Sequence, residues 1–569
     1  MQMLNVQKAD APMCRIPDVE TSAKDVAVEV ASPHEKERGR RRLLGRLKGG
    51  FGVLVVAKGG CATGFEVYRG AELIYAKEHG RGGPSRVLRE LRRVLDLLQK
   101  LDVGSREPSA EPLAADVREL AERHGEKFAE LAGRAYGTWE ESMRWLYGEA
   151  FEELGGEERR RLFAALSTYM AWVKALGAAL LEMALGRGKA KVAVELCMYG
   201  GEAAARLSAL WRLSAPHLDE YDWAFSPDAA SALDAFFRDL GAGLARYDWA
   251  KAPGADLLGR VYQRILPEEL RRQLGEYYTP SWIVKLMLWR ALHLLVRGKT
   301  PDELLPAGDA DREIVELLDE HYKKRGAIPR FVDPTCGSFA FGVQYIDALI
   351  KWYGERRPGL KPAEFVEEIL SNVVGIDVSP AAVATAKANY MLQICRFLAV
   401  SGVHLPRPPI LPIIRLDLLA LHQPRGLFSE ESPETGDWAA LNRRLALHVA
   451  RGGFDLVLGN LPWVGVSKYP EDYRRLVKHV AQSLGVQPPG PAAKKMDMSI
   501  PLFAVALRHL TNSRSVVALM VPASIFRGVH GARWRELLAK HKLAEVWDLG
   551  DVKPFVGAQS QPGIVFVAV

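Results

Sequence analysis

Three short apolar segments that each run into an acidic residue place the strongest constraint on the fold of this 569-residue chain. The first, Phe331–Phe341, passes through an Asp-Pro pair into a turn of small residues. The second is Val373–Pro380 and the third is Ile413–Asp417. Helical segments are expected after the first two, at 342–353 and 381–392. This alternation predicts an α/β fold with a doubly wound, mostly parallel, Rossmann-like sheet whose loops gather at one edge.

A fourth apolar strand begins at Phe454 and stops abruptly at the tetrapeptide Asn460, Leu461, Pro462 and Trp463. Ligands of open α/β sheets bind at the carboxyl ends of strands, where this tetrapeptide is expected to lie. An amide oxygen and a turn carbonyl can accept hydrogen bonds from an exocyclic amine, and an indole can stack on a flipped-out base. The same residues are also typical of an ordinary strand-ending turn with a partly buried tryptophan.

The turns after the first two strands indicate what kind of cofactor the sheet could hold. Asp377 ends the second strand, and an acid in that position commonly binds ribose hydroxyls. The first turn contains few glycines, and it has no Gly-x-Gly-x-x-Gly cradle for a pyrophosphate. The pattern therefore favours a nucleoside-containing cofactor over a dinucleotide.

Taken together, these motifs resemble the DNA adenine-N6 methyltransferases of restriction-modification and related defence systems. Within them the chain resembles the gamma class, which includes type I and type IIG-like enzymes. Asp333–Phe341 resembles the first cofactor motif, Gly275–Pro280 the upstream motif and Asn460–Trp463 the catalytic motif. The segments that resemble the strands after the catalytic motif are 515–526, 546–555 and 556–564. The resemblance covers roughly residues 255 to 569, and a motif gains force from the context predicted for it.

The resemblance implies transfer of a methyl group from S-adenosylmethionine to adenine N6 in double-stranded DNA. Methylation of cytosine N4, whose amine chemistry is similar, is the alternative reaction. No metal is implied. The catalytic residues that it implies are Asn460, Leu461, Pro462 and Trp463. The cofactor-binding residues that it implies are Tyr278, Thr279, Pro280, Asp333, Cys336, Gly337, Asp377, Val378, Asp417 and Leu418. Among them the resemblance implies that Asp377 binds the ribose and that Asp417 lies near the cofactor adenine.

Two residues depart from the family pattern. Phe339 replaces the second glycine of the first cofactor motif, where a side chain could crowd the cofactor. Leu461 replaces the first proline of the catalytic motif, where proline also constrains the turn. A catalytically impaired subunit that binds DNA or cofactor within a defence complex is therefore a second hypothesis.

The chain is predicted to contain three parts: a small α/β unit at 1–105, a helical region at 106–254 and the methyltransferase domain at 255–569. The small unit contains Pro17-Asp18 and Glu29, which resemble part of a Mg²⁺ nuclease motif, but Ala31 stands where that motif has lysine. An ordinary α/β unit or an inactive nuclease remnant is expected. Four tryptophans of the helical region are expected in its core rather than at a base-stacking surface, namely Trp139, Trp145, Trp172 and Trp211.

Composition agrees with a nucleic-acid partner without requiring one. The net charge is +7, which permits binding to DNA, as it does in many proteins that bind none. The five cysteines form no Cys-x-x-Cys pair, so neither a zinc site nor a disulfide framework is indicated. No signal-like N-terminal segment is apparent, and a cytoplasmic location is expected. Relatives usually continue past their last strand into a target-recognition domain, whereas this sequence stops at Val569. Three alternatives are open: the chain is a fragment, a separate target-recognition or nuclease subunit is its partner, or the helical region reads the DNA.

Overall fold

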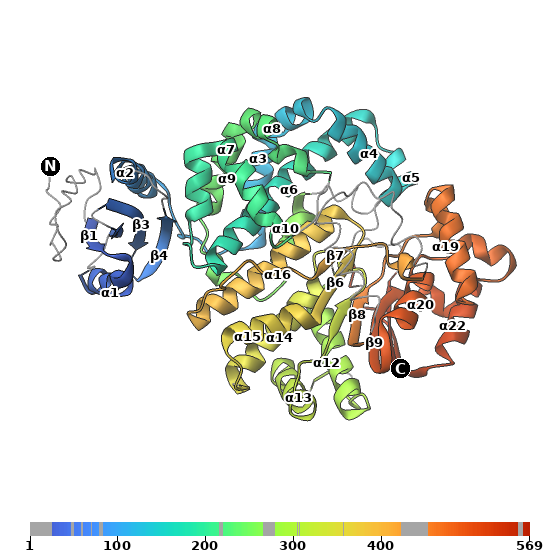
Figure 1. Cartoon of the computed structure of the whole chain (residues 1–569). Coiled ribbons are helices and arrows are strands. Elements are labelled where there is room, and N and C mark those ends of the chain that lie inside the picture. Colours follow the sequence, from blue (N-terminus) through green and yellow to red (C-terminus); the bar gives the residue numbers. More distant parts are fainter. Residues whose placement is uncertain are drawn as a thin grey trace.

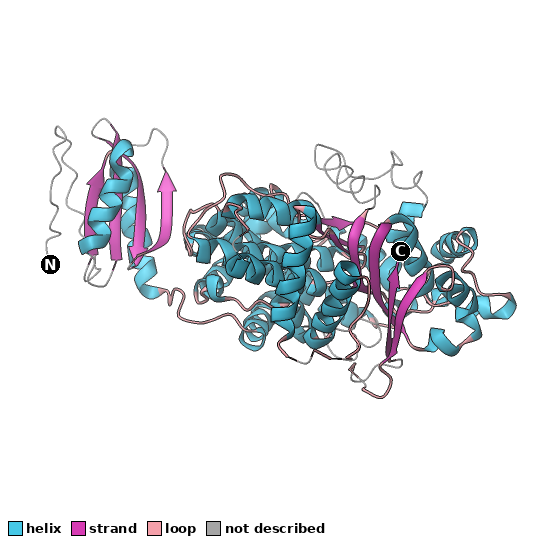
Figure 2. Ribbon diagram, turned by 90° about the horizontal axis from the view of Figure 1, so that it is seen from below, coloured by secondary structure: helices cyan, strands magenta, loops and turns pink. Residues whose placement is uncertain are grey.

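The computed structural model describes residues 26–569 except 47–50, 59–60, 70, 79–83, 216–219, 266–278, 304, 307, 357, 423–452, 553 and 556–560. A seven-stranded sheet lies at one end of the molecule and a separate four-stranded sheet at the other, with a helical region between them (Figure 1). The N-terminal sheet lies beside the helical region, at the opposite end of the molecule from the large sheet (Figure 2).

The large sheet has the strand order β10-β11-β9-β8-β5-β6-β7. Its strands are β5 (Phe331–Asp333), β6 (Val373–Asp377), β7 (Ile413–Arg415), β8 (Phe454–Asn460), β9 (Thr511–Pro522), β10 (Lys542–Asp548) and β11 (Pro562–Ala568). The strands from β9 to β7 are parallel, whereas β11 runs antiparallel to both β9 and β10. The predicted doubly wound, mostly parallel sheet is confirmed.

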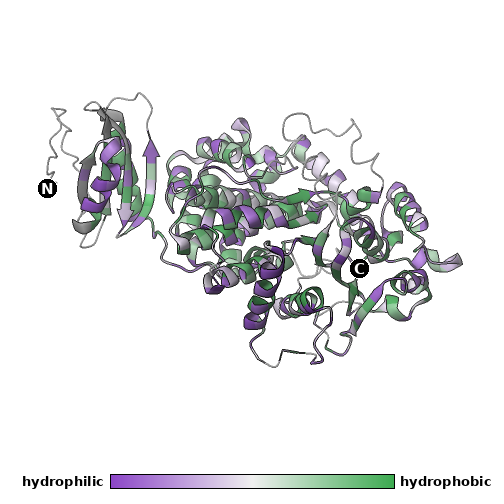
Figure 3. Cartoon of the chain, turned by 60° about the horizontal axis from the view of Figure 1, so that its bottom comes forward, coloured by the Kyte–Doolittle hydropathy of each residue, from purple (hydrophilic) through white to green (hydrophobic). Residues whose placement is uncertain are grey.

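Helices cover both faces of this sheet because its strands are buried on both sides. In β8, Leu456 and Leu458 pack into one hydrophobic cluster, while Phe454 and Val457 pack into the other. One face carries α12 (Ser281–Arg297), α13 (Ala310–Arg325), α14 (Ala340–Arg356), α15 (Pro362–Asn372) and α16 (Pro380–Ser401). The other carries α19 (Glu471–Ser483), α20 (Ser499–His509) and α22 (Ala532–Leu538). Strands buried on both faces read as continuous apolar runs, which is why the sequence revealed them. Figure 3 shows mainly green strands inside the molecule and more purple on its outer helices.

The helical region packs directly on the seven-stranded sheet and shares its larger hydrophobic cluster. Its helices are α3 (Ala110–Leu131), α4 (Arg134–Tyr147), α5 (Glu149–Glu152), α6 (Gly156–Ala184), α7 (Lys191–Arg212), α8 (Pro227–Ala232), α9 (Asp234–Ala245) and α10 (Leu257–Ile265). The long helix α6 lies against α16, where the Tyr169 and Thr385 hydroxyls are 3.0 Å apart and the Cys395 thiol donates to the Leu180 carbonyl. The predicted boundary at 254 therefore does not separate two cores.

By length and composition, helix α6 could cross a membrane. Among the described residues it is the one helix with this property. Its most apolar window is 89% buried by the rest of the protein, and this burial is the environment of a core helix. Its position beside α16 accounts for that composition without a membrane.

The N-terminal sheet has the order β1-β2-β3-β4 and packs between two helices. Its strands are β1 (Val26–Ala31), β2 (Phe51–Lys58), β3 (Cys61–Arg69) and β4 (Glu72–Glu78), and its helices are α1 (Lys36–Arg46) and α2 (Pro84–Lys100). Alternate residues of β2 point to opposite faces: Val53 packs toward α2, and Leu54 packs toward α1. Strands β3 and β4 pair antiparallel.

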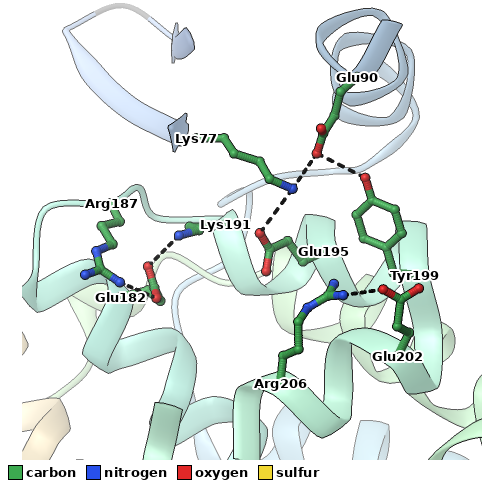
Figure 4. A network of polar contacts seen from close by, with 9 residues as sticks. All are labelled: Lys77, Glu90, Glu182, Arg187, Lys191, Glu195, Tyr199, Glu202 and Arg206. Carbon is green, nitrogen blue, oxygen red and sulfur yellow. Dashed lines mark hydrogen bonds and ion pairs between the residues drawn. The ribbon is translucent and has the colours of Figure 1, made fainter. Parts of the chain in front are cut away.

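Backbone hydrogen bonds and an ionic network attach this unit to the helical region. Residues 187–190 run beside β4, where the Ala76 N–H donates to the Arg187 carbonyl and the Ala190 N–H to the Ile74 carbonyl. Lys77 lies 2.5 Å from Glu90 of its own unit and 4.0 Å from Glu195 of α7 (Figure 4). The contact covers a sheet edge that would otherwise leave backbone groups unpaired.

Three of the four predicted core tryptophans are confirmed, and the fourth is wrong. Trp139, Trp172 and Trp211 are at most 4% exposed. Trp145 is 40% exposed. It follows Trp139 by six residues, which is about 240° around a helix, so the two side chains leave α4 on different faces.

Candidate functional site

A cavity of about 320 Å³ opens at the carboxyl ends of the parallel strands. The residues that line it come from the sheet, from α4 and α10 of the helical region, and from the segment after β8. Most of the residues predicted for the site lie in its wall: Thr279, Asp333, Cys336, Gly337, Asp377, Val378, Asp417, Leu418, Asn460, Leu461, Pro462 and Trp463. Pro280 is the N-cap of α12 and is not part of the wall, and Tyr278 lies outside the described residues.

The turn after β5 is held from both neighbouring strands. The Cys336 N–H donates to the Ile376 carbonyl at 2.8 Å, which connects the turn to β6. The Thr335 hydroxyl donates to the Asn460 carbonyl at 3.1 Å, which connects it to the end of β8. Gly337 adopts a φ of +52°, a conformation that glycine reaches without strain. These contacts form one rigid floor for the cavity.

Asp377, at the end of β6, contacts the same turn from the other side. One carboxylate oxygen accepts from the Gly337 N–H and the other from the Ser379 N–H, each at 2.8 Å. Each oxygen has a second lone pair, so the carboxylate retains capacity for two hydroxyl donors. Two backbone bonds thus fix the orientation of the Asp377 carboxylate at the cavity.

Burial raises the pKa of every acid in the wall. The pKa of Asp377 and that of Asp417 are raised by desolvation, although backbone N–H donors oppose the rise in both. The pKa of Asp333 is raised well above its usual range by desolvation, with a smaller contribution from the Asp377 charge. Among the described residues, no ion pair joins these three acids to a cation, and this favours a ligand with hydroxyl donors or positive charge.

Asn460 presents an unused acceptor to the cavity. Its side-chain nitrogen donates to the Thr279 hydroxyl at 3.2 Å, which sets the orientation of the amide. Its side-chain oxygen is buried and has no hydrogen-bond partner. A buried acceptor without a partner costs on the order of 1–3 kcal/mol, so it indicates a donor that arrives with a ligand.

Leu461 and Trp463 are anchored on opposite sides of the turn. The Leu461 N–H donates to the Met520 carbonyl at 3.2 Å, and its side chain is buried in the cluster below the sheet. The Trp463 ring meets the edge of Phe555 at a centroid distance of 5.2 Å and an interplanar angle of 78°. Packing of Leu461 and the bond to β9 thus hold a turn that proline constrains in the family.

Phe339 does not crowd the cavity, so the expectation that it could obstruct a cofactor is wrong. Its ring is fully buried and stacks on Tyr390 at 5.5 Å with an interplanar angle of 11°. It is the one described non-glycine residue with positive φ, at +74°, a backbone conformation that favours glycine. The side chain leaves on the core side, where Gly342 and Gly375 provide its space.

We expect Gly342→Ala to destabilise the fold, because the added Cβ would lie 2.0 Å from the Phe339 ring. Overpacking of this kind costs roughly 1–3 kcal/mol, which urea denaturation would measure as a lower free energy of unfolding. Gly354→Ala is the matched control in the same helix, since its Cβ would meet nothing within 4 Å. Combining Gly342→Ala with Phe339→Ala should relieve the clash. Equal stability of the two single glycine variants would contradict this packing.

Several wall residues were not predicted from the sequence. They are Trp145 and Tyr147 of α4, Gly259, Tyr262 and Gln263 of α10, and Lys468, Tyr469, Tyr473, Met498 and Leu502 after the catalytic turn. These residues are far apart in the sequence and reach the cavity through tertiary packing, so no local pattern predicts that they line it. Among them, only Trp145 could have been singled out from the sequence, because it lies off the apolar face of α4 that contains Trp139 and Met143.

The acids of the N-terminal unit are used in ion pairs. The Glu29 carboxylate accepts from Arg42 of α1 at 2.7 Å, and Glu66 pairs with Lys36 at 2.6 Å. Within the described ranges, no group of three or more His, Cys, Asp and Glu side chains is placed to hold a metal ion. Asp18 lies outside the described residues, so the nuclease resemblance stays a prediction.

Comparison with known proteins agrees with this geometry. The curated adenine-specific methyltransferase PglX of Streptomyces coelicolor (strain ATCC BAA-471 / A3(2) / M145) is 28% identical over 150 residues, which are 26% of this chain and 10% of that protein. The matched segment thus spans about a tenth of this relative.

Solved structures of restriction-modification enzymes are also similar. The type IIL enzyme MmeI in complex with DNA is 18% identical, with a TM-score of 0.47 over 81% of this chain and 58% of that one. The type I methyltransferase subunit from Streptococcus thermophilus is 15% identical, with a TM-score of 0.35 over 81% of this chain and 85% of that one.

The sequence profile of the Eco57I restriction-modification methylases matches residues 371–555. This segment contains Asp377 and Asp417 at the ends of their strands, and the whole turn from Asn460 to Trp463. Over residues 371–555, this chain is therefore similar to the Eco57I restriction-modification methylases.

Proposed function

We propose that this chain transfers a methyl group from S-adenosylmethionine to the N6 amine of adenine in double-stranded DNA, as part of a restriction-modification or defence system. The observation that carries the proposal is the buried, unpartnered Asn460 side-chain oxygen in the wall of the cavity. The similarity of residues 371–555 to the Eco57I methylases and the adenine-specific activity named for PglX support it.

The acidic side of the cavity suits the methyl donor, which supplies an electrophilic methyl group on a positively charged sulfur. Asp377 would accept hydrogen bonds from the ribose hydroxyls while its backbone bonds to Gly337 and Ser379 stay in place. The Asp417 carboxylate accepts from the Leu419 N–H at 3.0 Å and lies in the same wall, where it would face the donor's adenine. Phe339 leaves this space open because its ring packs on the core side.

The end of β8 suits the methyl acceptor. An exocyclic adenine amine is a poor nucleophile because its lone pair is delocalised into the ring. The Asn460 side-chain oxygen and the Leu461 carbonyl would accept its two N–H groups and direct the lone pair toward the methyl group. Trp463 would stack on the flipped base. Alignment of this kind lowers a barrier without a strong base, and the proton can leave after the methyl group has been transferred.

Methyl transfer from radiolabelled donor to mixed genomic DNA would test the proposal, with and without the products of neighbouring genes. Digestion of the labelled DNA to nucleosides identifies the modified base. N6-methyladenine is the expected product, whereas N4-methylcytosine would select the cytosine alternative. Binding of the donor without transfer to any DNA, in every combination of partners, would instead favour the impaired subunit and contradict the proposed reaction.

A further inference from the structure

Trp145 of the helical region lies beside the donor end of the cavity. It lines the cavity, and 40% of its surface is exposed. Its ring meets Tyr473 of α19 at a centroid distance of 5.2 Å and an interplanar angle of 62°. The Tyr473 phenol in turn lies close enough to the Asp417 carboxylate to lower the pKa of that acid, against the larger rise from burial. A chain of contacts therefore connects an exposed indole to the acid after β7.

The order of the strands separates this end from the acceptor end. Asn460 ends β8, and Asp417 follows β7, with β5 and β6 between them. Three interstrand spacings of about 4.8 Å place the two ends roughly 14 Å apart. One flat base cannot reach from Asn460 to Asp417, so a ring held at Trp145 and Tyr473 belongs to a different part of the bound ligands than the methyl acceptor.

The position of α4 is set closely enough to present a side chain to this site. Gly148 follows α4 with a φ of +51°, and a Cβ on it would lie 2.1 Å from the Lys468 carbonyl oxygen. The helix is also connected to β7, because the Ser142 hydroxyl and the Arg415 guanidinium both donate to Glu220, at 2.5 and 3.0 Å. These contacts hold the face of α4 that contains Trp145 over the cavity.

We propose that Trp145 forms an aromatic wall for the adenine of the methyl donor, so that the helical region completes the donor site. This inference rests on the proposed function. Tyr473 supports the indole by an edge contact, and its hydroxyl fixes the Asp417 carboxylate beside the same ring. Burial raises the pKa of Tyr473, so the phenol stays protonated and remains a donor.

Calorimetric titration with S-adenosylmethionine and with S-adenosylhomocysteine would test this role. Stacking of a base on an aromatic side chain is worth enough that Trp145→Ala should weaken both ligands by roughly ten-fold. Trp145→Phe should recover most of that affinity. In methyl transfer, Trp145→Ala should raise the KM for the donor and leave kcat at saturating donor nearly unchanged, because Trp145 lies away from the acceptor end.

Trp282→Ala is the matched control, since Trp282 is 46% exposed on α12 and does not line the cavity. We expect it to bind both ligands as the parent does. A folded Trp145→Ala protein with parental affinity would overturn the inference and leave the proposed function standing. A parent that binds neither ligand would overturn both. If Trp145→Ala instead raised the KM for DNA alone, Trp145 would belong to the acceptor side and the inference would be wrong.

Discussion

Replacing Asn460 with alanine is expected to lower the rate constant of methyl transfer by about 10²-fold or more, the loss typical when one aligned polar group is removed from a transition state. The side-chain oxygen of Asn460 is buried and has no hydrogen-bond partner among the described residues, so it can accept from the acceptor amine. Single-turnover assays with saturating donor and DNA would isolate this step from binding.

The donor should bind the Asn460→Ala protein almost as tightly as it binds the parent, because the amide stands at the other end of the cavity from Asp417. Thr279→Val is the companion variant. It removes the hydroxyl that accepts from the Asn460 amide at 3.2 Å, and so it should reduce the rate less than loss of the amide itself. An Asn460→Ala protein that forms N6-methyladenine at the parental rate would refute the mechanism.

Asp377→Ala is expected to weaken the methyl donor by a factor of roughly 10² or more. Two hydrogen bonds from ribose hydroxyls to a charged acceptor would be lost, each worth about 1.5–3 kcal/mol. Calorimetry at fixed pH measures the change directly. Asp377→Asn keeps the volume and one acceptor oxygen, so it should retain part of the affinity.

Because Asp377 also accepts the Gly337 and Ser379 N–H groups, its loss would loosen the turn as well as remove the ligand contacts. Denaturation of each variant without ligand separates these two effects. Equal donor affinity in the parent and in a folded Asp377→Ala protein would remove Asp377 from the donor site.

Donor affinity should also depend on pH in a defined direction. Desolvation raises the pKa of Asp377 in the free protein, and the ionised carboxylate is the stronger acceptor. Affinity should therefore fall as the pH is lowered through that raised pKa and rise as the acid ionises. Titrations across pH should show this trend in the parent and a weaker one in Asp377→Asn, which has no carboxyl proton to exchange.

The sequence determined the architecture of the catalytic sheet and the edge at which its site lies. Apolar runs that end in Asp333, Asp377 and Asp417 have the length and composition of strands buried on both faces, and the alternating helices require a parallel arrangement. Carboxyl ends of parallel strands meet at one edge, so a local pattern was enough to bring these acids and Asn460 together.

Only the tertiary structure shows where the side chain of Phe339, which departs from the family pattern, is directed. From sequence, Phe339 could point into the cavity or away from it. The positive φ directs its side chain to the core, and the space left by Gly342 and Gly375 accommodates the ring. No local pattern connects a phenylalanine with a glycine 36 residues later, because their contact depends on how α14 and β6 pack together.

The contribution of the helical region was also beyond the sequence. Amphipathic helices report which face is buried, but not against which partner, so α4 and α10 could not be placed at the cavity in advance. Trp145 and the buried Trp139 lie on different faces of α4, and the six-residue spacing between them indicates this. The tertiary packing of Gly148 against Lys468 shows that this face of α4 meets the donor end of the cavity. The residues at that end lie some 300 positions later in the chain. Burial of a shared core is what brings such distant side chains together.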